Sequence, residues 1–259
     1  MKKIKRTALL ALWIIIISAV TFLSIRALNE HRNKLCHALV IDIDNNGFKL
    51  FMTDEQIRNI LKDSIGVIEG MPMADIDLLR IRSLVNNLNF YEDITVYSTL
   101  SGEVKIELKQ RKPLVRVFMP GGLSYYIDDK GLLMPLSPNY SAHVIAATFS
   151  DNLVFNHQDI FAKKPVEHIS IDLHNIFLLA EFIRNDNFWN AVVSQIIIND
   201  NDLAFTTKIG NHIVIVGEPI LLEEKFEHLL LFYKQVLEVK GWHTYDTINL
   251  KFRNKVICS

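Results

Sequence analysis

The stretch FYEDITVYSTLSGEVKIELKQRKP, residues 90–113, has the pattern of two strands joined by a tight turn. Apolar residues alternate with polar ones on both sides of Ser101-Gly102: Ile94, Val96, Val104, Ile106 and Leu108. Alternation with a period of two predicts strands with one buried face, and the Ser-Gly pair predicts a hairpin turn. The pattern changes after Pro113. We therefore expect one domain over residues 38–118 and a second over residues 119–259.

A strand and two helices precede this hairpin. Residues 39–43 alternate as a strand, and Thr53-Asp54-Glu55-Gln56 has the form of a capping box, which begins a helix. Gly66 and Gly70 end that helix, and a second helix is expected from about Asp75. The order strand, helix, helix, strand, strand predicts a small α+β domain whose two helices cover one face of a three-stranded sheet.

The second half of the chain predicts a mixed β-domain with helices. Strands are expected at residues 125–127, 132–134, 168–173, 195–198, 203–207 and 212–216. Helices are expected at residues 175–184 and from Pro219 to Gly241. In the closing stretch YDTINLKFRNKVICS, residues 245–259, the residues Ile248, Leu250 and Phe252 alternate with polar ones. This pattern predicts a last strand, and a terminal strand often forms the open edge of a sheet.

The N-terminus predicts a membrane anchor. Residues 7–25 form an uncharged stretch of 19 residues, and about 20 apolar residues cross a bilayer as a helix. The basic residues Lys2, Lys3, Lys5 and Arg6 precede it, which places residues 1–6 in the cytoplasm. Residues 26–37 then form a stem, and the rest lies across the membrane. A cleaved signal peptide is the alternative, but the apolar run is longer and lacks an A-x-A-like site.

Composition and motifs argue against catalysis and nucleic-acid binding. The net charge is −1, whereas nucleic-acid binders carry a basic excess, and the two cysteines are too few for a four-thiolate zinc site. The stretch HISIDLH places His168 and His174 on one face of the expected strand, which raises an anchored metalloenzyme as an alternative. Six strand residues span about 20 Å, too far for one metal ion. We expect no catalytic, cofactor or metal site, and no small-molecule substrate.

The ordered motifs resemble the FtsQ/DivIB family of bacterial cell-division proteins, in its Bacteroidetes branch. The resemblance rests on residues 90–96, 104–108 and 110–113, on Tyr126-Ile127-Asp128-Asp129-Lys130-Gly131, on Gly210-Asn211-His212, Glu224-Lys225-Phe226 and Gly241-Trp242, and on Asn249-Leu250-Lys251-Phe252. The family more often has Glu where Gln110 stands. The resemblance implies a cytoplasmic tail, one inner-membrane helix, a POTRA domain and a β-domain in the periplasm, at the division septum.

The resemblance also implies partners and a binding site. In this family the last strand of the β-domain receives a strand from FtsB, which is joined to FtsL. Carried over, this expects partner contacts at Val256, Ile257 and Cys258, with Phe252 and Tyr245 nearby. The alternative is that Ile248, Leu250 and Phe252 face the protein's own core. A different function, a POTRA-bearing chaperone or assembly module for exported proteins, also fits a single POTRA domain.

Overall fold

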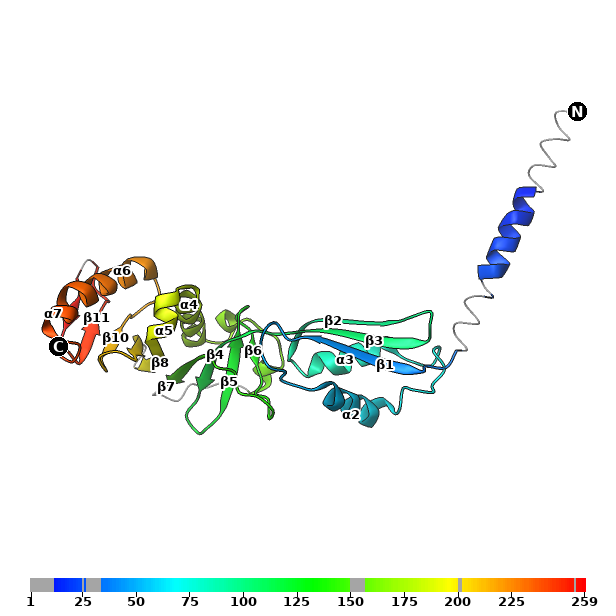
Figure 1. The fold of residues 1–259 in the computed structure, drawn as a ribbon, viewed down its shortest axis with the longest axis horizontal. Coiled ribbons are helices and arrows are strands. Elements are labelled where there is room, and N and C mark those ends of the chain that lie inside the picture. Colours follow the sequence, from blue (N-terminus) through cyan, green and yellow to red (C-terminus); the bar gives the residue numbers. More distant parts are fainter. Residues whose placement is uncertain (1–11, 25, 27–33, 150–156, 200–201, 254) are drawn as a thin grey trace, which may run out of the picture. The chain divides into compact units, whose positions relative to one another are not determined.

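A computed structural model describes residues 12–24, 26, 34–149, 157–199, 202–253 and 255–259. Contacts divide the chain into two compact units (Figure 1). The first comprises Met1–Asp44 with Thr53–Lys109, and the second comprises Asn45–Met52 with Gln110–Ser259. The sequence-based boundary at residue 118 lies further along the chain than this division.

The first unit contains its elements in the expected order: β1 (Ala38–Asp44), α2 (Asp54–Ile65), α3 (Leu78–Asn87), β2 (Tyr91–Ser98) and β3 (Glu103–Gln110). The strands form one sheet in the order β1-β3-β2, with β1 parallel to β3. The two helices bury Ile57, Leu61, Ile81 and Val85, and β3 buries Val104, Ile106 and Leu108. The buried face of the hairpin therefore forms the sheet side of this core. The expected α+β class is confirmed.

Local capping sets where the two helices begin. At α2 the Thr53 hydroxyl accepts from the Gln56 N–H at 3.3 Å, and the Gln56 side chain accepts from the Thr53 N–H at 3.0 Å. The capping box read from the sequence is thus confirmed. At α3 the Asp77 carboxylate accepts from the Arg80 N–H at 2.9 Å, so the helix begins at Leu78, not at Asp75.

Segment 45–52 follows β1 in sequence but belongs to the second unit. Gln110 holds it there with both halves of its amide. The side-chain oxygen accepts from the Phe51 N–H at 2.9 Å, and the side-chain nitrogen donates to the Lys49 carbonyl at 3.1 Å. A carboxylate has no donor for a carbonyl. Glutamine therefore suits this buried position, where a glutamate could not donate to the carbonyl.

Nine strands of the described chain form the sheet of the second unit, in the order β12-β11-β10-β9-β8-β7-β4-β5-β6. Their bounds are β4 (Pro113–Phe118), β5 (Ser124–Asp128), β6 (Leu133–Met134), β7 (Ile145–Phe149), β8 (Val193–Asn199), β9 (Asp202–Thr207), β10 (Ile213–Ile215), β11 (Thr247–Asn249) and β12 (Ile257–Cys258). Parallel pairs join β4 to β7, β7 to β8 and β10 to β11. The other neighbours are antiparallel, so the sheet is mixed, as expected.

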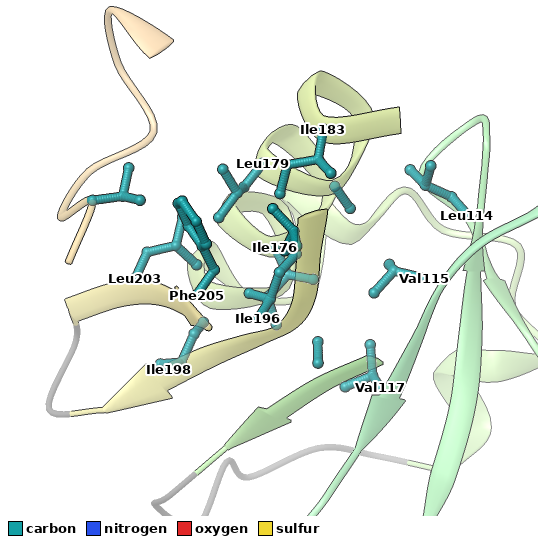
Figure 2. Close-up of a cluster of buried hydrophobic side chains, with 14 of the residues drawn as sticks. Leu114, Val115, Val117, Ile176, Leu179, Ile183, Ile196, Ile198, Leu203 and Phe205 are labelled. Atoms are coloured by element: carbon teal, nitrogen blue, oxygen red, sulfur yellow. The ribbon is translucent and has the colours of Figure 1, made fainter. Parts of the chain in front are cut away.

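Helices pack on this sheet and form one apolar core with it. Their bounds are α4 (Ile171–Asn185), α5 (Asn187–Val192), α6 (Leu222–Phe232), the π-helix η3 (Tyr233–Leu237) and α7 (Glu238–Lys240), with short 3-10 turns η1 (His157–Ile160) and η2 (Val166–His168). Figure 2 shows Ile176, Leu179 and Ile183 of α4 facing side chains of β4, β8 and β9. These residues recur at helical spacing, which is why one face of α4 is buried.

The expected strand at residues 168–173 is wrong, because α4 begins at Ile171. Ser170 is its N-cap, and the Ser170 hydroxyl accepts from the Asp172 N–H at 3.2 Å. The apolar alternation of this stretch is misleading, since the Ile171 side chain is 67% exposed. The last helix also begins later than expected, at Leu222, after Leu221 adopts a left-handed conformation with φ of 52°.

The expected membrane segment, residues 7–25, lies partly outside the described residues, as do the expected tail and most of the stem. Residues 12–24 are helical with exposed side chains. No helix within the described ranges combines the length and apolar character that a membrane crossing requires.

Candidate functional site

The sheet of the second unit ends at β12. This strand pairs antiparallel with β11, with Ile248 opposite Cys258 and Asn249 opposite Ile257. Next to this register, Thr247 and Ser259 exchange two backbone hydrogen bonds, each of 3.1 Å. Among the described strands, none lies on the other side of β12. The C-terminal strand is therefore the edge of a nine-stranded sheet.

The backbone of Cys258 faces away from the sheet. In an antiparallel pair, residues that exchange hydrogen bonds alternate with residues whose N–H and C=O point the other way. Because Thr247 and Ser259 are a hydrogen-bonded pair, the adjacent pair of Ile248 and Cys258 is not. The Cys258 N–H and C=O therefore point outward from the edge. Continuing the alternation places the same groups of Val256 on that side.

The side chains of this edge alternate as well. Val256 and Cys258 are half-buried against the core, whereas the Ile257 side chain is 48% exposed on the opposite face. Burial raises the pKa of the Cys258 thiol, so it stays protonated and is a poor nucleophile. An incoming strand would meet open backbone groups here, with apolar side chains on both faces.

A pocket of about 240 Å³ lies beside the edge. Leu250 and Phe252 line it from the segment after β11. Ile220 and Leu221 line it from the residues before α6, and His228 lines it from within that helix. Phe252 is 52% exposed and Leu221 is equally exposed, so apolar surface is open to solvent in this pocket. Charged side chains surround it, four basic and one acidic, and Arg253 pairs with Glu224 at 3.8 Å: Glu224, Lys225, Lys251, Arg253 and Lys255. The pocket can accept an apolar side chain from a segment bound at the edge.

Of the five residues expected to bind a partner, the structure places Val256, Ile257 and Cys258 together on the edge and Phe252 in the adjacent pocket. Tyr245 lies instead before β11, where its ring packs 5.9 Å from the Phe232 ring and its hydroxyl accepts from Lys240 at 3.3 Å. Tyr245 is therefore partly buried against the core of the second unit and is not part of β12. The expectation did not include Ile220 and Leu221, which line the pocket with Phe252. The sequence signals them only as an apolar pair directly after Pro219.

The closing strand is shorter than the alternation of residues 248–252 predicts. β11 ends at Asn249, whose side-chain oxygen accepts from the Lys251 N–H at 2.9 Å and turns the chain. Ile248 and Leu250 are buried, as the alternative of an own-core role expected, but Phe252 is exposed. The turn is what releases Phe252 from the core and lets the chain return as β12.

The segment that leads into β11 packs in a cluster of His212, Tyr233 and Trp242. The His212 Nε2 lies 2.6 Å from the Tyr233 hydroxyl, and the Tyr233 ring meets the Trp242 ring edge-on at 5.2 Å. A Cβ at Gly210 would lie 2.6 Å from the Trp242 carbonyl oxygen, so only glycine fits there. The motifs Gly210-Asn211-His212 and Gly241-Trp242 are thus parts of one cluster, which positions the chain just before the edge strands.

This cluster predicts that acid destabilises the second unit. Burial lowers the pKa of His212 from its ordinary value of 6.5. The unfolded chain therefore binds a proton that the folded chain does not, and the stability contributed by neutral His212 is lost as pH falls below about 6.5. The unfolding midpoint should drop between about pH 7.5 and about pH 5.5. His212→Gln should be less stable at both pH values but show a shallower drop.

Thermal unfolding followed by circular dichroism measures how the unfolding midpoint of the wild type and of His212→Gln changes with pH. The exposed His143 offers the control substitution His143→Gln in the same unit. Equal slopes for the wild type and His212→Gln would contradict the assignment of the drop to His212.

The described residues contain no group of three His, Cys, Asp or Glu side chains that could hold a metal ion. His168 lies in the 3-10 turn η2, where its Nε2 is 3.5 Å from the Glu167 Oε1. His174 lies on α4. The two histidines therefore do not share a strand face. Cys36 and Cys258 are both free thiols.

Comparisons with known proteins agree with this division of the chain. Residues 112–259, more than half of the chain, match the family model described as FtsQ/DivIB, C-terminal related. Residues 34–109 match the model of the POTRA-like domain. No curated protein matches the chain.

Proposed function

Because the chain belongs to the FtsQ/DivIB family of cell-division proteins, we propose that it is a bitopic scaffold of the division machinery that binds its partners by strand addition at β12. The family is one of non-catalytic, membrane-associated division proteins. In this proposal residues 1–6 lie in the cytoplasm, residues 7–25 cross the inner membrane, and residues 26–33 form the stem, which is shorter than the expected 26–37 because the buried Cys36 already belongs to the first unit. The POTRA-like domain and the β-domain then act in the periplasm and link early and late division proteins.

The observation that carries the proposal is the open outer side of β12. The outward N–H and C=O of Cys258 have the geometry of a sheet edge, at which a foreign strand completes the ladder. Proteins usually blunt such edges. Here the edge keeps an exposed Ile257 and an apolar pocket beside it, which supports retention for binding. The partners are an FtsB-like chain, which supplies the strand, and an FtsL-like chain joined to it.

The edge can be tested by one backbone change. Proline lacks an N–H, and it is tolerated on an edge strand when that N–H faces outward. Cys258→Pro should therefore abolish capture of the FtsB-like and FtsL-like chains, because it removes the outward donor at Cys258 and leaves the Thr247–Ser259 bonds in place. Co-purification of the two chains with the full-length protein from cross-linked cells measures capture.

Cys258→Ser is the matched control, since it keeps the backbone N–H and should retain capture. Thermal unfolding of Cys258→Pro should stay close to that of the control. Removal of residues 254–259 should have the same effect on capture as the proline. Full capture by both altered chains would show that strand addition at β12 is not the binding mode.

Depletion of the protein separates the scaffold from the alternative of an assembly module. Failure of division produces filamentous cells, whereas failure of an export module lowers the amount of outer-membrane proteins at normal cell length. A fluorescent tag on the cytoplasmic end should collect at midcell if the proposal is right.

A further inference from the structure

Exposed apolar side chains gather at one end of the first unit, around the turn between β2 and β3. The Leu100 side chain lies in this turn and is 82% exposed, and Leu35 is 59% exposed. The His37 N–H donates to the Gly102 carbonyl at 3.0 Å, and a Cβ at Gly102 would lie 3.3 Å from the Leu35 carbonyl oxygen. The two leucines therefore lie at the same end, which we call the hairpin tip (Lys34, Leu35 and Leu100).

Hydrogen bonds hold this turn in one conformation. The Thr99 N–H donates to the Glu103 carbonyl at 2.9 Å, and the Gly102 N–H donates to the Thr99 carbonyl at 3.1 Å. The hydroxyls of Thr99 and Ser101 lie 2.6 Å apart. Because the turn is closed in this way, the Leu100 side chain is kept at the apex, away from the core of its own unit.

A cation accompanies the two leucines. Lys34 is exposed, and its Nζ donates to the Leu100 carbonyl at 3.0 Å. The hairpin tip thus combines apolar side chains with an exposed ammonium group next to them. Such a combination suits the membrane interface, where apolar side chains reach the acyl chains and lysine meets lipid phosphates.

Chain length brings this end of the unit to the membrane. The expected membrane helix ends at residue 25, and Lys34 is the first residue described after positions 27–33. At about 3.3–3.6 Å per residue, the eight residues between them, 26–33, span at most about 30 Å. The hairpin tip follows residues 26–33 directly through Lys34 and Leu35, so a lipid surface is the nearest partner available to it.

We propose that the hairpin tip inserts Leu35 and Leu100 into the periplasmic face of the membrane that holds the anchor, with Lys34 on the lipid phosphates. The inference rests on the anchor in the proposed function, and it is independent of strand addition at β12. A second attachment would fix the orientation of the first unit against the bilayer, which a single-chain stem cannot do.

Site-specific labelling of the full-length chain in lipid nanodiscs tests this. The discs contain phosphatidylethanolamine and phosphatidylglycerol, with or without nitroxide-labelled lipid. Leu100→Cys is labelled with the fluorophore NBD in a Cys258→Ser background, where the remaining Cys36 is only 1% exposed. The NBD emission should shift to shorter wavelength and be quenched by the nitroxide lipid. Adding Leu35→Asp, a change at an exposed side chain, should reduce both effects.

Leu123→Cys is the matched control, because Leu123 is also an exposed leucine in a turn between two strands, at 50%, but lies in the second unit. Its label should report water and no quenching. A Leu100 label that reports only water, in a chain that resists carbonate extraction from membranes, would overturn the inference and leave the anchor standing. Release of the chain by carbonate would overturn the anchor and this inference with it.

Discussion

Replacing Arg111 with methionine should lower the free energy of unfolding of the second unit by about 3–5 kcal/mol, because it leaves a buried carboxylate without its cation. The Arg111 Nε donates to Asp128 at 2.7 Å, and the two side chains are 2% and 1% exposed. The Asp128 carboxylate also accepts from the N–H groups of Lys130 and Leu132, at 3.0 and 2.8 Å. The pair therefore ties the entry to β4 to the turn between β5 and β6.

The partners of Asp128 make the two sides of this pair unequal. Asp128→Leu removes the carboxylate and also leaves two backbone N–H groups without their acceptor, so it should cost at least as much as Arg111→Met. The double variant should recover only part of the loss. Lys251→Met is the control, because the Lys251–Asp202 pair is 2.9 Å long but exposed, and such pairs contribute about 0–1 kcal/mol.

Urea unfolding followed by tryptophan fluorescence measures these differences. In a Trp13→Phe background the remaining tryptophans, Trp189 and Trp242, both lie in the second unit, so the signal reports that unit alone. A loss for Arg111→Met no larger than that for Lys251→Met would contradict a structural role for the buried pair.

Local signals in the sequence predicted the first unit well. The capping box at Thr53, the apolar alternation of residues 94–108 and the Ser101-Gly102 turn each act within a few residues, so they can be read without knowing the fold. The start of α4 was missed because two local signals conflict there. Residues 168–173 carry both a strand-like alternation and a serine N-cap, and packing of the apolar face of α4 on the sheet decides between them.

The site depends on contacts that are distant in sequence. Residues 256–258 could be placed near an edge because a terminal strand favours one, but their pairing with β11 requires the turn after Asn249. The pocket joins Leu221 to Phe252, which only the packing of α6 brings together. The buried pair likewise joins residues 17 positions apart in two motifs that the sequence displays separately. The partner-binding role of residues 256–258 and of the pocket stays a prediction.

Replacing Phe226 with alanine should lower the free energy of unfolding of the second unit by about 3–5 kcal/mol, through lost burial and the cavity left behind. The Phe226 side chain is 2% exposed, and its ring centroid lies 4.7, 4.9 and 5.3 Å from those of Phe182, Trp189 and Phe205. It therefore joins α6 to α4, α5 and β9.

The destabilisation caused by Phe226→Ala should extend to the edge strand β12, because α6 forms one wall of the pocket and leads into the cluster around Tyr233. Leu231→Ala, at a side chain of the same helix that is 45% exposed, is the matched control and should change stability by no more than about 0.5 kcal/mol. Urea unfolding of both variants in the Trp13→Phe background compares them, with emission from Trp189 reporting directly on the cavity. If the two substitutions cost the same, α6 is not held by its aromatic contacts, and the pocket beside β12 has no rigid wall.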